Sequence, residues 1–173
     1  MLTAVVEGAA HPLTLNKFEG DALLLYAEAD GNLEAACADV YAQAQRFFAV
    51  FEAQRSELQR LRSNCDCDAC ANISGLTLKV LVHQGEMAIR QWRQFTELAG
   101  EPVILIHRLL KNPVPAREYL LLTDSFRDIC GITAGIPLDV AVEGLDTTRV
   151  YWLPPPEPGA SPLSDRPSPG SLA

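Results

Sequence analysis

The sequence predicts an α+β domain with a ferredoxin-like core, in which helices lie on one face of a mostly antiparallel sheet. Three observations predict this class: a strand hairpin near the N-terminus, one long amphipathic helix after it, and several strand patterns separated by short helices in the second half. The chain has 173 residues, and 48% of them are hydrophobic, which is enough to bury one core. We therefore expect a single domain over residues 1–153.

In the first half, each predicted element follows from a local pattern. Residues 1–8 have the composition of the end of a helix, which opens at Met1 without a cap and stops at Gly8. The stretch "LTLNKFEGDALLLY" predicts a hairpin, with Gly20 supplying the backbone angle of its turn. After Asn32, a candidate N-cap, apolar residues recur at helical spacing as far as Leu61, which predicts one long amphipathic helix.

The second half alternates strand and helix patterns. The stretch "LTLKVLVHQGEMAIRQW" predicts a second hairpin that turns at Gln84 and Gly85. There follow a short helix ending at Asn112, a strand in "REYLLLTD", a brief helix in "SFRDIC" and two closing strands in "GIPLDVAVEGLDTTRVYWL". Residues 154–173 contain 7 prolines, so we expect a disordered tail there.

The charge and the cysteine content limit the classes of partner. A formal net charge of −8 disfavours nucleic acid, because such binding needs a basic face that displaces counterions from phosphates. The first residues lack the regions of a secretory signal, and no run approaches the ~18 apolar residues of a membrane span. Five cysteines, three of them in "CDCDAC", suit a reducing compartment better than a secreted disulfide framework. We expect a cytoplasmic protein with no nucleic-acid partner and no membrane partner.

The cysteine-rich loop contains a candidate metal site. Cys65, Cys67 and Cys70 form a C-x-C-x2-C pattern that can bring three thiolates onto one soft metal ion, with Zn²⁺ as the candidate. A structural zinc site has four ligands. The candidates for the fourth are His83, Asp66, Asp68 and a residue of a partner chain. The alternative is a set of reduced surface thiols or a labile disulfide.

Three segments resemble, in order, those of the class III nucleotidyl cyclases. "KFEGD" resembles the K-x-x-G-D hairpin of that family, "LKVLVHQGE" resembles its strand "LRVGIHxGP", and "TELAGEPVILIHRL" resembles "YDVWGDTVNLASRM". Because "VEGLDTTRVYWL" is similar to the closing strands, the resemblance spans roughly residues 1–153 and implies the nucleotide cyclase fold. The cysteine loop and "HRLLKN" look closer still to an uncharacterised bacterial branch of that superfamily, a domain of unknown function.

The resemblance implies a role for four residues. Asp21 matches a metal-binding aspartate that would hold Mg²⁺ or Mn²⁺ against a triphosphate. Lys17 and Glu97 match the residues that read a purine base, and Arg108 matches the transition-state arginine. Because the family assembles this site across a head-to-tail dimer, the resemblance also implies a homodimer and a purine nucleoside triphosphate as ligand.

Two departures from the family pattern bear on catalysis. Ile104 stands where the family has an asparagine, and its side chain cannot hydrogen-bond a substrate oxygen. The family's first metal-binding aspartate lies in a strand like "DxSGFT" before the first helix, and this sequence has no such segment.

Three functions are consistent with these residues. The first is a degenerate cyclase-homology domain that acts as a nucleotide-binding or regulatory dimerisation module. The second is an active purine nucleotide cyclase when the N-terminal metal-binding segment is present. The third is a metal or redox sensor built on the cysteine loop. The two departures favour the first.

Overall fold

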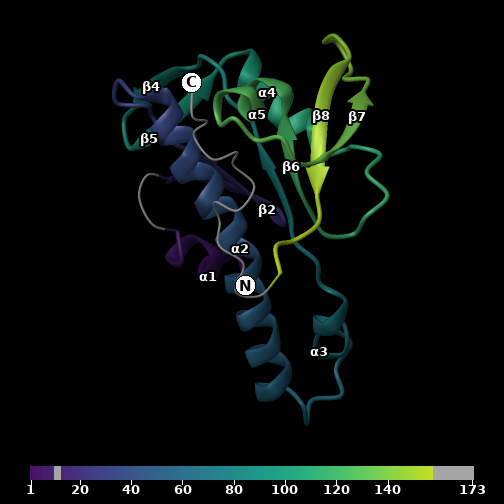
Figure 1. The fold of residues 1–173 in the computed structure, drawn as a ribbon. Helices are drawn as coiled ribbons and strands as arrows, with labels where there is room; N and C mark the ends of the chain where they lie inside the picture. Colours follow the sequence, from purple (N-terminus) through teal and green to yellow (C-terminus); the bar gives the residue numbers. More distant parts are fainter. Residues whose placement is uncertain (10–12, 158–173) are drawn as a thin grey trace.

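The computed structural model describes residues 1–9 and 13–157, and Figure 1 shows a body of sheets and helices with one long helix running past it. In these ranges the helices are α1 (Leu2–Glu7), α2 (Leu33–Leu61), α3 (Asp68–Ala71), α4 (Glu101–Leu109) and α5 (Asp124–Ile129), with a 3-10 turn η1 (Ile73–Gly75). The strands are β1 (Thr14–Glu19), β2 (Ala22–Tyr26), β3 (Lys79–Val82), β4 (Ala88–Trp92), β5 (Phe95–Ala99), β6 (Tyr119–Thr123), β7 (Ile136–Val140) and β8 (Thr148–Leu153). Most of the predicted tail, residues 158–173, lies outside the described residues.

The centre of the body is a four-stranded sheet in the order β3-β6-β8-β7. β3 runs parallel to β6, whereas β8 pairs antiparallel with both β6 and β7. β6, with the sequence "YLLLT", is buried at every position, as expected for a central strand that is covered on both faces. The α+β class and the antiparallel-rich sheet are therefore confirmed.

Helices are distributed over both faces of this sheet rather than over one. On one face, Leu120 and Leu122 of β6 pack in a cluster with the phenylalanines of α2. On the other face, Leu121 packs with Leu105 and Leu109 of α4. Successive residues of a strand point to opposite faces, so α2 and α4 cover opposite sides of β6.

The first hairpin forms a sheet of its own. β1 and β2 pair antiparallel, and the turn uses Gly20 at a φ of 64°, as predicted. A register shift between Leu15 and Lys17 leaves Asn16 out of the ladder. Among the described residues β2 pairs only with β1 and β3 only with β6, so each of these strands keeps one edge without a strand partner. The hairpin is held to the body by side chains such as Leu25, which packs against the core cluster of α2.

The prediction of a second hairpin that turns at Gln84 and Gly85 is wrong in position. The hairpin lies later in the chain, between β4 and β5, and it turns at Arg93, whose φ is 54°. A Cβ on Gly85 would lie 2.4 Å from Cγ of Pro102, so this glycine lets the chain pass close to the start of α4. β3 therefore ends at Val82 and pairs with β6 instead of folding back on β4.

Helix α2 continues well past the core. Asn32 caps it as predicted, because its side chain accepts a hydrogen bond from the backbone N–H of Ala35 at 3.0 Å. Phe51 is the last buried residue of the helix, and the turns after it are partly or fully exposed. Together with the returning chain they form a projection, here called the arm (residues 52–76), at the bottom of Figure 1. Neither α2 nor any other helix in the described ranges is long and apolar enough to span a membrane.

Two contacts hold the limbs of the arm together. Nη1 of Arg55 donates a hydrogen bond to the backbone oxygen of Leu76 at 2.8 Å. The turn η1 contacts α2, and Ile73 within it is buried. The cysteine loop and α3 are therefore carried at the end of a packed structural element.

Candidate functional site

A chain of polar side chains connects the end of β1 with α4. Nζ of Lys17 lies 2.9 Å from Oε1 of Glu19, and the second oxygen of Glu19 lies 2.8 Å from Nε2 of His107. Nδ1 of His107 is 2.5 Å from the backbone oxygen of Val103, one turn earlier in α4. Lys17, which the resemblance assigns to reading a base, is thus engaged by an acid of its own strand.

His107 lies between two acceptor groups. Its Nε2 faces the carboxylate of Glu19 and its Nδ1 faces the backbone oxygen of Val103. Glu19 in turn lies between Lys17 and His107. The hydrogen bond from Lys17 and, to a lesser extent, the charge of His107 hold the pKa of Glu19 below its ordinary value.

Glu19 and His107 were not identified as site residues from the sequence. Lys17 and Glu19 are two residues apart on a strand, which places them on the same face, and this spacing could have indicated their pairing. No local pattern links Glu19 to His107, because the two lie on elements far apart in the sequence.

A second contact links β1 to the hairpin of β4 and β5. Nδ2 of Asn16, the residue left out of the ladder, donates to the backbone oxygen of Thr96 at 2.7 Å. Lys17 and Glu97, the two predicted base-reading residues, each follow one of these linked residues, so they lie on two strands of separate sheets that this hydrogen bond joins. Glu97 is exposed, and Arg90 lies directly opposite it in the ladder.

Arg108 faces a different part of the body from His107. Its Nη1 lies 2.9 Å from the position that a Cβ on Gly144 would take, so the guanidinium covers the loop between β7 and β8. A shallow depression of about 430 Å³ opens at this loop, and its lining includes Gly144 and two acids, Glu101 and Asp146. The predicted transition-state arginine thus lies beside the β7–β8 loop, whereas its neighbour in the sequence contacts β1.

Asp21, which matches a metal-binding aspartate of the cyclases, and Ile104, which stands where they have an asparagine, are both at the surface. Asp21 is exposed at the turn of the first hairpin. Within the part of the chain that the structure describes, the group of metal-ligating side chains that gathers is the cysteine cluster, so Asp21 belongs to no cluster of carboxylates there. Ile104 exposes 48% of its surface on α4.

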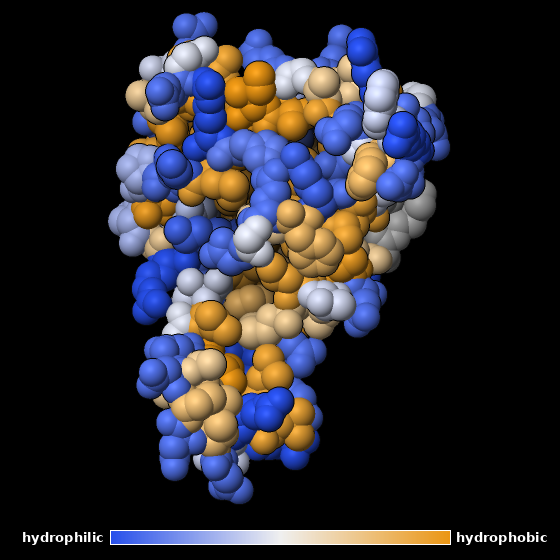
Figure 2. All heavy atoms as spheres, turned by 180° about the vertical axis from the view of Figure 1, so that it is seen from behind, coloured by the Kyte–Doolittle hydropathy of each residue, from blue (hydrophilic) through white to orange (hydrophobic). Residues whose placement is uncertain are grey.

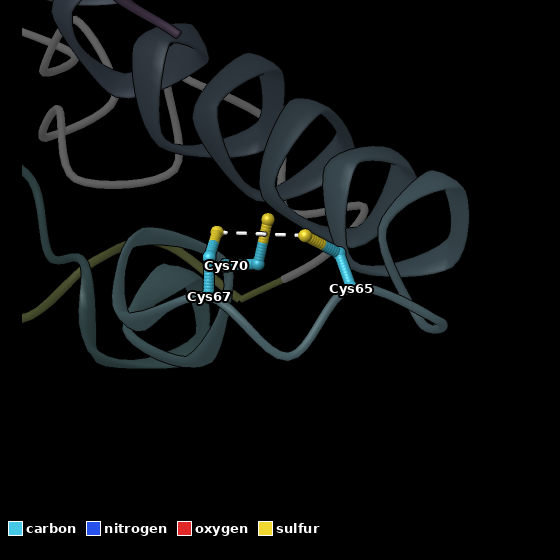
Figure 3. A group of neighbouring side chains, drawn as sticks. All are labelled: Cys65, Cys67 and Cys70. Carbon is cyan, nitrogen blue, oxygen red and sulfur yellow. Dashed lines mark hydrogen bonds between the residues drawn. The ribbon is translucent and has the colours of Figure 1, made fainter.

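Figure 3 shows the three cysteines of the arm converging beside the last turns of α2. The sulfur atoms of Cys65, Cys67 and Cys70 all lie within 4.8 Å of one another, and Sγ of Cys65 donates to Sγ of Cys67 at 3.4 Å. The backbone N–H of Cys70 is the main cause that lowers the pKa of Cys67, to about 7. The hydrogen bond with Cys67 raises the pKa of Cys70 to about 11. The loop therefore favours one thiolate, on Cys67, near neutral pH.

The three fourth ligands that were proposed from this chain, His83, Asp66 and Asp68, do not join this cluster. Asp66 and Asp68 are its neighbours in the sequence, yet no carboxylate or histidine of the described residues belongs to the group of converging ligand atoms. His83 lies at the end of β3 instead, where its Nδ1 is 2.8 Å from Oγ1 of Thr123. Burial lowers the pKa of His83, as expected for a histidine packed against the sheet.

Comparison with known sequences identifies relatives over most of the chain. The family model described as a protein of unknown function (DUF2652) matches residues 1–119, which is more than half of the chain and includes the cysteine loop. The uncharacterized protein Rv2561/Rv2562 of Mycobacterium tuberculosis is 32% identical over 158 residues, which cover 88% of this chain and 71% of that protein.

Among solved structures, the crystal structure of the guanylyl cyclase Cya2 matches with a TM-score of 0.59. The match covers 91% of this chain and 77% of that chain at 12% sequence identity. An identity this low shows a shared fold alone. The nucleotide cyclase fold implied by the resemblance is therefore confirmed.

Proposed function

Because the chain belongs to the family of proteins of unknown function DUF2652 and shares the fold of a guanylyl cyclase, we propose that it is a cyclase-homology domain that has lost cyclisation. In this proposal it acts in the cytoplasm as a regulatory dimerisation module. The observation that carries the proposal is the ion pair between Lys17 and Glu19. Glu19 engages the ammonium group that would otherwise donate to a purine base, and the partner acid lies within the site motif itself.

The other site positions also support a loss of catalysis. Phosphoryl transfer by two metal ions needs carboxylates that place an ion on both the attacking and the leaving oxygen. Asp21 is exposed and gathers with no further metal ligands in the described residues. Ile104 has no group that could hydrogen-bond a ribose or phosphate oxygen.

Exposed aromatic side chains support dimerisation. Trp92 and Phe95 lie opposite each other at the end of the β4–β5 hairpin and expose 70% and 57% of their surfaces. Phe18 of β1, the strand linked to β5 through Asn16, exposes 54%. Hydrophobic residues also reach the surface in other places, interleaved with hydrophilic ones (Figure 2). Aromatic residues are enriched at protein interfaces, so we assign the homodimer interface to Phe18 and the β4–β5 hairpin.

For a residual ligand we propose a purine nucleoside triphosphate. Lys17 of β1 and Glu97 of β5 would face its base, and Asp21 would hold the Mg²⁺ or Mn²⁺ that accompanies its phosphates. Arg108 would pair with phosphate oxygens through its planar guanidinium. The Lys17–Glu19 pair weakens such binding, because the ammonium must first leave its carboxylate partner.

Light scattering coupled to size-exclusion chromatography tests the dimer. We expect the full chain to have the mass of two copies and a Trp92→Asp/Phe95→Asp double variant to have the mass of one. Ile136→Asp is the matched control, because Ile136 is an apolar residue of β7 that exposes 51% of its surface away from the proposed interface. A monomeric parent, or a double variant that remains dimeric, contradicts the proposed interface.

An activity assay tests the loss of cyclisation. With ATP or GTP and Mn²⁺, we expect no cyclic nucleotide above the level of an Asp21→Ala variant. Cyclic nucleotide that the parent makes and the variant does not would show an active purine nucleotide cyclase and would reject the proposed function.

A further inference from the structure

We propose that Cys65, Cys67 and Cys70 bind one Zn²⁺ through their three thiolates, and that an exogenous ligand such as water completes the coordination. The site lies on the arm and is separate from the residues that carry the proposed function. It rests on the convergence of three sulfur atoms that come from one short loop.

The spacing of the sulfur atoms fits a zinc ion. A Zn–S distance of about 2.3 Å and tetrahedral angles place sulfur ligands about 3.8 Å apart. The three sulfur atoms already lie within 4.8 Å of one another, and those of Cys65 and Cys67 are 3.4 Å apart. Small side-chain movements therefore convert the cluster into three corners of a tetrahedron.

Backbone contacts hold the loop on both sides of the cluster. The N–H of Cys65 donates to the oxygen of Arg62 at 3.0 Å, which continues the end of α2 into the loop. The oxygen of Cys67 accepts from the N–H of Ala71 at 3.0 Å, which forms the first turn of α3. Because these bonds already order the loop, the loop loses less conformational entropy when Zn²⁺ binds than a flexible loop would lose.

The surroundings leave one coordination position open. Cys65 and Cys67 are exposed and Cys70 is half-buried, so an ion among them is reached from solvent. Cys65 and Cys70 border a depression of about 220 Å³, large enough for water or a small ligand, and Arg62 also lines it. Three thiolates and one Zn²⁺ together carry one negative charge, and a cationic residue, Arg62, is among those that line the same depression.

A three-thiolate site with an open position differs from a closed structural zinc site. In closed sites four protein ligands surround the ion, whereas sites with three protein ligands keep the fourth position for an exchangeable group. The described residues supply only the three sulfurs, so we assign the arm to the open class. A cysteine, histidine or carboxylate of another molecule is chemically suited to the fourth position.

Metal content of the full chain tests the site. The protein is purified under a non-chelating phosphine reductant, stripped with a chelator, reloaded with Zn²⁺ and freed of excess metal before elemental analysis. We expect one zinc per chain in the parent and essentially none in Cys65→Ser/Cys67→Ser/Cys70→Ser. Asp66→Asn/Asp68→Asn is the matched control and should retain one zinc, because these carboxylates lie outside the cluster.

Three outcomes overturn the site. The first is a parent that takes up no zinc, and the second is a triple serine variant that retains it. The third is a parent that forms a disulfide among these cysteines under the same reductant. Its intact mass would then be lower by the mass of two hydrogens. Circular dichroism of the triple variant should match that of the parent without metal, because these side chains are at the surface of the arm.

Cobalt substitution tests the open position. Co²⁺ bound to three thiolates gives visible absorption bands that depend on the fourth ligand. Titration with imidazole should shift these bands without removing the metal. Bands that stay unchanged at saturating imidazole would show a closed site and would overturn the open fourth position. Neither test involves nucleotides, so the outcome is independent of the proposed function.

Discussion

Lys17 and Glu19 lie two residues apart on β1 and form an ion pair at 2.9 Å. Their side chains remain 46% and 32% exposed, so the pair lies at a surface that a ligand or a partner can reach. Glu19 also contacts His107 of α4, which fixes the hairpin relative to that helix. One acid therefore both engages the charge of Lys17 and links two elements of the body.

Removing the charge of Glu19 should release Lys17. We expect Glu19→Gln to bind ATP or GTP about two- to fivefold more tightly than the parent in isothermal titration calorimetry. An exposed ion pair contributes about 0.2–1 kcal/mol, and each 1.4 kcal/mol corresponds to about a factor of ten in affinity. Adding Lys17→Ala should abolish the gain. A gain that survives this second change would show that Lys17 does not contact the nucleotide.

The same acid makes stability depend on pH. Because the folded-state pKa of Glu19 lies below its ordinary value of 4.5, its contribution is fully present above that value and is lost as the pH falls through the folded-state pKa. We expect the parent to lose more stability than Glu19→Gln between neutral pH and about pH 3, measured by urea unfolding. Glu28→Gln, at an exposed carboxylate after β2, should follow the parent. Equal acid sensitivity of all three proteins would contradict the role of the pair.

The close approach at Gly85 predicts a steric effect. A Cβ there would lie 2.4 Å from Cγ of Pro102, so Gly85→Ala should destabilise the domain by about 1–3 kcal/mol. Gly75→Ala is the control, because a Cβ at that position meets no atom within 4 Å. Thermal unfolding gives the melting temperature of each variant and of the parent. Equal melting temperatures for the two variants would show that the chain moves away from Pro102 at little cost.

The packing of α4 on the sheet predicts a core effect. Leu121 is fully buried on the face covered by α4, so Leu121→Ala should cost about 2–5 kcal/mol of unfolding free energy. Leu76→Ala, at a leucine of the arm that exposes 43% of its surface, should cost much less. Denaturant unfolding gives the unfolding free energy of both variants and of the parent. A small effect at Leu121 would contradict a helix-covered second face.

Elements with a local pattern could be predicted from the sequence. The cap at Asn32 and the helical spacing after it predict α2, and Gly20 predicts the turn between β1 and β2. The convergence of Cys65 and Cys70 could also be predicted, because a loop of six residues keeps them close.

Features that depend on contacts between residues far apart in the sequence could not be predicted from it. The glycine at position 85 has the composition of a turn, yet the structure uses it for a close approach to Pro102, which no local pattern reveals. The bond between Asn16 and Thr96 joins residues 80 positions apart. The contact of Glu19 with His107 is of the same kind, because it joins β1 to α4, two elements far apart in the sequence.

Helix α2 also has a mechanical property. Its 29 residues extend over about 44 Å, at ~1.5 Å per residue, without an interruption. The part of the helix from Cys37 to Phe51 packs in the core, and the turns after Phe51 belong to the arm. A continuous helix resists bending, so a force on the tip is transmitted as a torque to its contacts with α5 and β3. A molecule that binds the arm at the cysteine loop would thus change the orientation of α2 relative to the sheet.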